Sequence, residues 1–251
     1  YSSVSGNTKE MVQLVDHVHK IGARVFAFID TPGSTLTQPG KSEHLIVYPV
    51  NEQLKFFMVC NYLMYKNGEF PEYERYNKEM EAHLAKGLAE VEKSSDEWAY
   101  NYAKEQFEFF VAHPDLPHYF VGSGTQYGAT YSYAMCYWEE QMWIRTKSIS
   151  CPEFFHGMQE ILVWDTPVTL FMNEDEQRPL AERVARFLPK VNSNYTIIDS
   201  KEFPMEGISP EFRGSISHLV LHGVNNRVDA YMELFLRHPL SIRRYYRQFD
   251  Y

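Results

Sequence analysis

Long apolar runs are missing from this sequence. No stretch of about 18 consecutive apolar residues occurs along its 251 residues, so the sequence predicts no membrane-spanning helix. Cysteine is scarce: Cys60, Cys136 and Cys151 are widely spaced and form no CxxC pair. An odd number without paired spacing argues against a disulfide framework and against a zinc site, and it favours a reducing, cytoplasmic location.

Positive charge is also in short supply. The formal net charge is −9, which argues against a general nucleic-acid-binding protein, although it allows a local basic pocket for a phosphorylated metabolite. The GxxxxGK[ST] pattern of nucleotide P-loops is missing. Hydrophobic residues reach 44% and aromatic residues 16%, enough for a substantial core. The composition therefore indicates a globular protein and is compatible with binding of a phosphorylated small molecule.

Short apolar runs alternate with helical patterns along the chain, which predicts parallel β-α-β units and an α/β fold. Strands are expected at 23–29, 44–50, 118–124, 167–173 and 194–200. Helices are expected at 7–21, 53–65, 96–112, 125–144, 178–190 and 210–237, with a short helix or turn at 152–162. We expect two similar doubly wound αβα halves, 1–95 and 96–251, the second ending in a tail. The chain starts at the leading edge of a glycine turn, so we expect the first half to lack its first strand and helix.

The opening turn SVSGNT gathers Ser3, Ser5 and Thr8 around one glycine at a strand-to-helix junction. Unpaired N–H groups at a helix N-terminus carry partial positive charge, and neighbouring hydroxyls can donate to phosphate oxygens. The turn is therefore a candidate phosphate-monoester site. Simple helix capping is the alternative, because serine, threonine and asparagine are ordinary N-cap residues.

Acid–base chemistry has four candidates in the stretch EEQMWIRTKSISCPEFFHG: Glu139, Glu140, Glu153 and His156. A carboxylate and an imidazole can move protons near neutral pH. Each also has a structural alternative, since adjacent acids commonly face water and a histidine can cap a turn or lie in the core. The GSG at 122–124 is only a weak glycine signal.

In this order the motifs resemble the double sugar-isomerase (SIS) domain family. The resemblance rests on S-x-S-G-x-T opening a helix, a G-S-G-x-x-Y-G turn, a Glu-bearing helix and E-F-x-H-G, and it covers essentially the whole chain. The stretches YGATYSYAMCYWEEQMWI, CPEFFHGMQEI and HPLSIRRYYRQFDY look more closely like the deglycase branch. Members of that branch split phosphorylated fructosamines or glucosamines into sugar 6-phosphate and free amine. The resemblance therefore implies a deglycase that releases a free amino acid from a conjugate such as fructoselysine or glucoselysine 6-phosphate.

The resemblance implies a role for each matching residue. Ser3, Ser5 and Thr8 match the phosphate-binding hydroxyls. Glu140, sixteen residues before the histidine, matches the catalytic glutamate, and His156 matches the catalytic histidine. In this family that histidine reaches a neighbouring subunit's site, so a homodimer with shared active sites is implied. Where the family usually has H-G-P, this sequence has His156-Gly157-Met158.

The mechanism that the resemblance implies requires no metal or redox cofactor. The net charge predicts no nucleic-acid partner, and the lack of a long apolar run predicts no membrane partner. Two other functions remain open on these residues. One is a phosphosugar isomerase, or the isomerase domain of an aminotransferase such as glucosamine-6-phosphate synthase. The other is a non-catalytic phosphosugar-sensing module, which needs neither Glu140 nor His156. The amine, the sugar type and the roles of Glu139, Glu153 and the Arg243–Arg244 tail are left undetermined.

Overall fold

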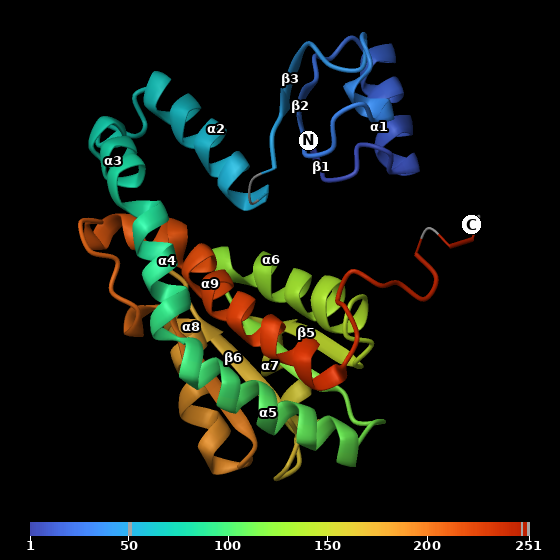
Figure 1. Ribbon diagram of the computed structural model, residues 1–251. Helices are drawn as coiled ribbons and strands as arrows, with labels where there is room; N and C mark the ends of the chain where they lie inside the picture. The colour runs from blue at the N-terminus through green and yellow to red at the C-terminus, as the bar shows by residue number, and fades with distance from the viewer. Residues whose placement is uncertain (50–51, 247, 250–251) are drawn as a thin grey trace. The chain divides into compact units, whose positions relative to one another are not determined.

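The computed structural model describes residues 1–49, 52–246 and 248–249. The chain forms two compact units, Tyr1–Tyr73 and Glu74–Tyr251 (Figure 1). The predicted division into family halves at 95/96 stays a prediction, while the compact units divide after Tyr73. The acidic–tyrosine ending of the tail, Asp250 and Tyr251, lies outside the described residues.

The first unit contains a parallel sheet in the order β1-β2-β3. Its strands are β1 (Ser2–Ser3), β2 (Phe26–Ile29) and β3 (His44–Val47), and its helices are α1 (Lys9–Lys20) and α2 (Glu52–Lys66). Val15 of α1 packs with Ala27 and Ile29 of β2, because the apolar positions of α1 recur at helical spacing. Gly22 closes α1 with a positive φ of 77° and donates its N–H to the His19 carbonyl, as expected for a helix C-terminus.

The second unit contains a parallel sheet in the order β5-β4-β6-β7. Its strands are β4 (His118–Gly122), β5 (Thr146–Ser150), β6 (Val168–Met172) and β7 (Tyr195–Asp199). Its α-helices are α3 (Tyr73–Glu79, beginning at the unit boundary), α4 (Ala85–Ser94), α5 (Asp96–Ala112), α6 (Thr125–Ser132), α7 (Cys151–Phe154), α8 (Arg178–Phe187) and α9 (Pro210–Leu236). Short 3-10 or π segments occupy Thr35–Thr37 in the first unit and Met80–Leu84, Tyr133–Glu139, Met158–Ile161, Leu188–Lys190 and Ser200–Glu202 in the second.

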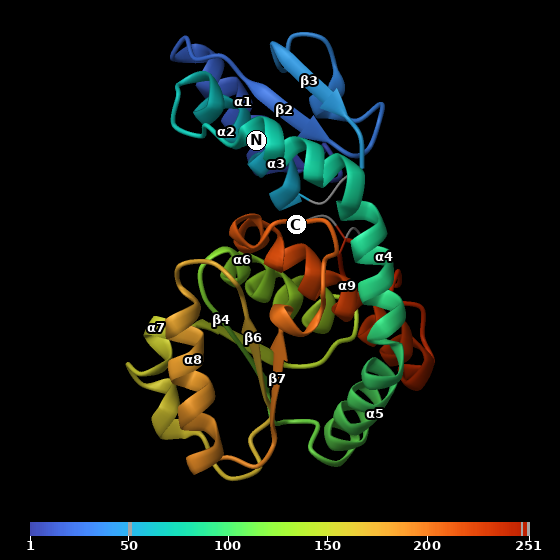
Figure 2. The same ribbon diagram turned by 90° about the vertical axis from the view of Figure 1, so that its left-hand side faces the viewer.

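Helices cover both faces of this second sheet (Figure 2). On one face, Val121 and Leu170 of the strands pack with Phe154 of α7 and Val184 of α8. On the other face lie α5 and α9, which pack against each other. The α/β class and the parallel sheets predicted from the sequence are therefore confirmed, and the second unit has the predicted three-layer αβα arrangement.

Two local predictions differ from the structure. The helix expected over 125–144 is regular only through Ser132 and continues as a π-helix over Tyr133–Glu139. Strand β5, with the sequence TKSIS, was not predicted because it contains a single large apolar residue. It lies at the sheet edge and, within the described part of the chain, pairs with β4 alone, so backbone hydrogen bonding rather than side-chain burial specifies it.

Candidate active site

In the first unit the hydroxyl turn lies between the end of β1 and the start of α1. The Ser3 hydroxyl accepts a hydrogen bond from the Gly6 N–H at 3.1 Å, and the Ser5 hydroxyl accepts one from the Asn7 N–H at 3.2 Å. Thr8 is the N-cap residue of α1, but its side chain makes no capping hydrogen bond. The predicted strand-to-helix turn is confirmed, and the exposed Thr8 hydroxyl is left available at the N-terminus of α1.

The loop after β2 braces this turn. The Leu36 N–H donates to the Gly6 carbonyl at 2.9 Å, and the Thr35 N–H donates to the Asn7 side-chain oxygen at 2.9 Å. Ser34 is buried beside Gly6, and its hydroxyl has no hydrogen-bond partner among the residues that the structure describes. The carboxyl ends of adjacent parallel strands thus gather polar groups at one edge, where ligands of open α/β sheets bind.

Sequence reasoning missed Ser34 and Asn7 as parts of this edge. The available signal was the glycine-containing segment TPGST directly after the second strand, which parallel pairing brings beside the first turn.

At the second glycine turn, Gly122–Gly124, the space in front of the turn is occupied by a side chain of the protein. The Asp175 carboxylate accepts hydrogen bonds from the Thr125 N–H at 2.6 Å and the Gln177 N–H at 2.9 Å. A Cβ atom on Gly124, whose φ is +56°, would lie 2.3 Å from an Asp175 oxygen. Asp175 therefore occupies the position that an anion would take at the N-terminus of α6, and the weak GSG signal is explained by packing.

The two adjacent glutamates lie at the end of the π-helix, and each has its own partner. The Glu140 N–H bonds the Met135 carbonyl five residues back at 3.0 Å, and such π segments often accompany functional sites. Glu139 accepts a hydrogen bond from the Thr146 hydroxyl of β5 at 2.7 Å. Glu140 instead accepts the Arg243 Nε–H from the C-terminal tail at 2.6 Å. Glu139 is thus tied to the sheet edge, whereas Glu140 is paired with the tail.

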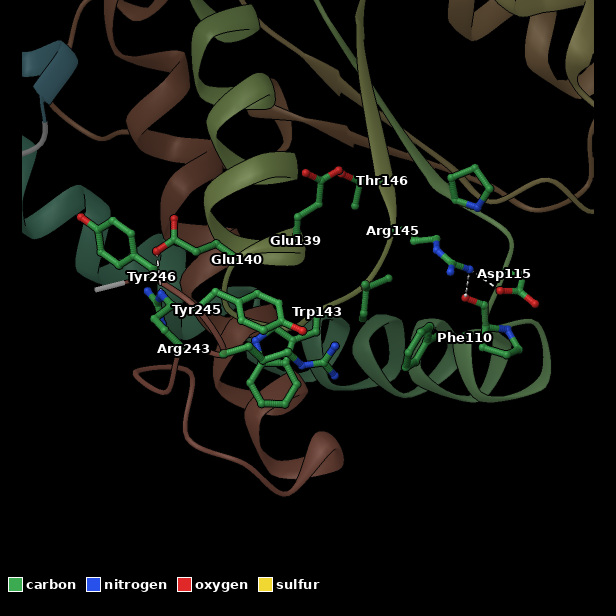
Figure 3. Close-up of a pocket in the computed structure, with 14 residues that line it drawn as sticks. Phe110, Asp115, Glu139, Glu140, Trp143, Arg145, Thr146, Arg243, Tyr245 and Tyr246 are labelled. Atoms are coloured by element: carbon green, nitrogen blue, oxygen red, sulfur yellow. Dashed lines mark hydrogen bonds and ion pairs between the residues drawn. The ribbon is translucent and has the colours of Figure 1, made fainter. Parts of the chain in front are cut away.

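An open cleft of about 880 Å³ in the second unit contains both glutamates (Figure 3). Its lining comes from the end of α5, from the turn between the π-helix and β5, and from the tail. The lining residues are Phe110, Pro114, Asp115, Pro117, Glu139, Glu140, Trp143, Ile144, Arg145, Thr146, Arg243, Arg244, Tyr245 and Tyr246. Apolar walls with a few convergent charged groups are typical of small-molecule sites.

His156 lies just after α7 and outside the lining of this cleft. Its side chain is exposed, and its backbone N–H donates to the Glu153 carbonyl at 2.8 Å. The structure of one chain therefore does not bring His156 into the Glu140 cleft, and its action in a neighbouring subunit stays a prediction. Ser150 is the N-cap residue of α7: its hydroxyl accepts the backbone N–H of Glu153 at 3.4 Å and donates to the Glu153 carboxylate at 2.6 Å.

A buried polar network lies behind the π-helix. The Tyr133 hydroxyl donates to Asp229 of α9 at 2.8 Å, and burial raises the pKa of Asp229 to about 8, partly offset by this hydrogen bond. His118 bonds the Thr169 hydroxyl at 2.8 Å, and burial lowers the pKa of His118 to about 3. Burial thus favours the uncharged forms of both Asp229 and His118, which fits a structural role behind the π-helix.

Across the described ranges, no group of three histidine, cysteine, aspartate or glutamate side chains is placed to hold a metal ion. Cys151 is buried, and desolvation raises the pKa of its thiol to about 12. No helix in the described part of the chain is long and apolar enough to cross a membrane.

Comparison with known proteins adds independent evidence. No family model matches the chain. Fructosamine deglycase FrlB of Bacillus subtilis (strain 168) is 27% identical over 258 aligned residues, which cover 99% of this chain and 76% of the relative.

Solved structures show the same fold. A putative phosphosugar isomerase from Bacillus subtilis is 27% identical with a TM-score of 0.85, and one from Salmonella typhimurium LT2 is 21% identical with a TM-score of 0.87; each comparison covers 100% of this chain and 76% of the other. The C-terminal domain of glucosamine-fructose-6-phosphate aminotransferase from Francisella tularensis is 13% identical with a TM-score of 0.72, covering 95% of this chain and 71% of that one. These findings confirm the predicted resemblance: the chain is a relative of a fructosamine deglycase and has the sugar-isomerase (SIS) fold of the phosphosugar isomerases.

Proposed function

We propose that this protein is a deglycase that hydrolyses a phosphorylated sugar–amine conjugate to sugar 6-phosphate and free amine. The observation that carries the proposal is Glu140, a carboxylate with 36% of its side chain exposed in a cleft of the second unit, sixteen residues before His156. Similarity to a fructosamine deglycase along nearly the whole chain supports the same chemistry.

The Ser3–Thr8 turn would hold the phosphate. Ser3 and Ser5 already shape the turn by accepting backbone N–H groups, and the Thr8 hydroxyl is left to donate to a phosphate oxygen. The N-terminus of α1 adds its partial positive charge. Specificity for the phosphorylated sugar would therefore come from the first unit.

Glu140 would move the proton. Its carboxylate takes a proton from C1 or C2 of the open-chain sugar, and the electron pair passes into an enaminol. The carbonyl oxygen gains a proton as the enaminol forms. Glu140 then returns its proton to the neighbouring carbon while the nitrogen loses its N–H proton, which leaves a C=N bond beside a hydroxyl. Water adds to the C=N bond and releases the amine and the sugar carbonyl. Glu140 ends the proton transfer ionised, as it began, and Arg243 fixes the direction of its carboxylate at 2.6 Å.

His156 would open the sugar ring or protonate the departing group, acting in the site of a neighbouring subunit. Its exposed position on the surface of the second unit is compatible with that role. The homodimer and the cytoplasmic location both remain predictions of the sequence.

The test is an assay of the full chain with a fructosamine 6-phosphate and with unmodified fructose 6-phosphate. We expect free amine and sugar 6-phosphate from the conjugate and little aldose–ketose interconversion of the plain phosphosugar. Interconversion without amine release would instead identify an isomerase. Tight binding of either compound without turnover would identify a sensing module.

A further inference from the structure

Glu140 follows directly on the stretch of π-helix described above. Regular α-helix ends at Ser132, and the segment Tyr133–Glu139 is wound as π-helix, in which an N–H bonds the carbonyl five residues back. The Glu140 N–H still bonds in this way, to the Met135 carbonyl at 3.0 Å. The hydrogen-bonded turn of a π-helix contains one residue more than that of an α-helix. The segment therefore rotates the residues that follow it about the helix axis.

This rotation decides which of the two adjacent glutamates points toward the tail. Successive residues of an α-helix lie about 100° apart around the axis, since one turn has 3.6 residues. One extra residue therefore turns Glu140 into the direction that Glu139 would take in a regular helix. In the structure Glu140 accepts the Arg243 Nε–H at 2.6 Å, whereas Glu139 accepts the Thr146 hydroxyl at 2.7 Å (Figure 3). With regular winding, Glu139 would point toward Arg243 and Glu140 would turn away.

Two buried aromatic residues five positions apart explain the π winding. Tyr133 begins the segment and Trp138 lies near its end, and they are only 3% and 1% exposed. Both rings pack on Phe120 of β4, with ring centres 5.4 Å and 5.0 Å away. Residues five apart point about 140° from each other on an α-helix but to nearly the same side on a π-helix. Burial of both rings against one strand residue therefore favours the extra residue.

The first of these residues is also held by its hydroxyl. The Tyr133 hydroxyl donates to the Asp229 carboxylate of α9 at 2.8 Å, and both side chains are buried. Further along the segment, the Thr146 hydroxyl of β5 lies 3.2 Å from the Ala134 carbonyl. The π segment is thus attached to a helix on one side and to the sheet edge on the other, and these attachments form without a ligand.

We propose that Tyr133 and Trp138 are positioning residues, whose five-residue spacing holds the π winding that turns Glu140, and not Glu139, toward Arg243. The proposal rests on the deglycase function given above, in which Glu140 is the base. Tyr133, Trp138 and Asp229 lie outside the lining of the cleft, so they act on the reaction through the helix.

The experiment moves the tyrosine by one position. The moved-tyrosine variant, Tyr133→Ala/Ala134→Tyr, keeps the composition and places the two aromatic residues four apart, a spacing that an α-helix brings to one face. Tyr133→Phe is a milder variant that loses the hydrogen bond to Asp229. Tyr102→Phe is the matched control, because Tyr102 is a buried tyrosine of α5 that shares a 2.6 Å hydrogen bond with Thr169.

Two measurements are made on the full chain. NMR of the Arg243 side chain follows its Nε–H, which donates to Glu140 in the wild-type protein, and each background is compared with and without Glu139→Gln or Glu140→Gln. Amine release from a fructosamine 6-phosphate gives kcat and KM for the same proteins. The NMR signal reports which glutamate faces Arg243 in the absence of substrate.

We expect Glu140→Gln to shift the Arg243 signal in the wild-type and Tyr102→Phe backgrounds, and Glu139→Gln to shift it in the moved-tyrosine variant. In that variant Glu139→Gln should also remove more of the remaining kcat than Glu140→Gln. Tyr133→Phe should lower kcat about 2- to 10-fold, the range for one buried hydrogen bond, with KM unchanged. Tyr102→Phe should keep the wild-type kcat.

An Arg243 signal that still responds to Glu140→Gln alone in the moved-tyrosine variant would overturn the proposal, because the aromatic spacing would then not set the direction of the glutamates. If circular dichroism shows that this variant does not fold, Tyr133→Phe decides, and a kcat equal to that of Tyr102→Phe contradicts the proposal. Absence of turnover in the wild-type protein would overturn the deglycase function alone, since the Arg243 signal would still report the winding.

Discussion

Glu139 and Glu140 show how two identical neighbouring side chains acquire different roles. The Thr146 hydroxyl engages Glu139, whereas Arg243 of the tail orients Glu140. Glutamine at 139 would keep an oxygen for the Thr146 hydroxyl, but glutamine at 140 could not accept a proton from the sugar.

We therefore predict that Glu140→Gln lowers kcat by about 10²- to 10⁴-fold, the usual contribution of a general acid–base group. Glu139→Gln should cost less than about tenfold by the same measure. Steady-state amine release by the two variants checks this, and circular dichroism confirms that both fold. Equal losses in the two variants would contradict the assignment of the base to Glu140.

Asp229 is the second residue whose surroundings make a measurable difference. Its folded-state pKa of about 8 lies above the ordinary value of 3.8 because the carboxyl is desolvated. Between about pH 4 and pH 8 the folded protein therefore keeps a proton on Asp229 that the unfolded chain has lost. The contribution of this proton to the free energy of unfolding decreases as pH rises through that range.

We predict that Asp229→Asn removes this loss, because the amide oxygen still accepts the Tyr133 hydroxyl and carries no charge. Between pH 5 and pH 8 the free energy of unfolding should shift in favour of the variant by up to about 1.4 kcal/mol per pH unit. Urea denaturation at both pH values measures the shift. The exposed Asp165→Asn is the control. If the difference in free energy of unfolding between Asp229→Asn and the wild-type protein did not change with pH, Asp229 would be ionised in the folded state.

At the scale of elements, the hydroxyl turn depends on one glycine. Gly6 has a φ of +61°, and a Cβ atom there would lie 2.0 Å from the Ser34 hydroxyl and 2.9 Å from an Ile29 methyl group. Gly22 at the end of α1 has a similar φ of +77°, but nothing lies within 4 Å of its added Cβ. An alanine at either position therefore has the same unfavourable left-handed backbone conformation, but only at Gly6 would its Cβ atom also overlap neighbouring atoms.

We predict that Gly22→Ala destabilises the protein by about 1 kcal/mol, the cost of a left-handed alanine. Gly6→Ala should cost at least about 2 kcal/mol more, because a buried overlap adds to that cost. Thermal unfolding measures both variants, and phosphate-dependent protection against heat should be lost only in Gly6→Ala. Equal destabilisation would mean that the loop after β2 does not brace the turn.

At the scale of the whole molecule, the separation of His156 from the Glu140 cleft leads to a prediction about the assembly of two subunits. If His156 serves a neighbouring subunit, a dimer of one Glu140→Gln chain and one His156→Ala chain keeps one intact site. We predict that a randomly assembled mixture of the two inactive variants recovers roughly a quarter of wild-type activity, as two-fold symmetry requires. Co-expression with separate affinity tags and an amine-release assay check it. Failure to recover activity in isolated mixed dimers would place His156 in the site of its own chain.

Much of the fold could be read from local patterns. Helix α5 begins and ends at the predicted residues, Asp96 and Ala112, and strands β4, β6 and β7 lie within their predicted ranges. Burial imposes a periodicity on these segments, and periodicity is visible in a linear sequence. The opening turn was equally local, since β1, the glycine and α1 follow one another within ten residues.

What the sequence could not reveal depends on residues that are far apart along the chain. The edge strand β5 is specified by its hydrogen bonds to β4, the N-terminus of α6 is filled by Asp175, and Glu140 is oriented by Arg243, 103 residues away. No spacing rule connects such residues, because their contact exists only after the helices and strands have packed. The residue types and their local order thus predicted the fold, the similarity to a fructosamine deglycase and a candidate glutamate. Packing selected the partners of that glutamate.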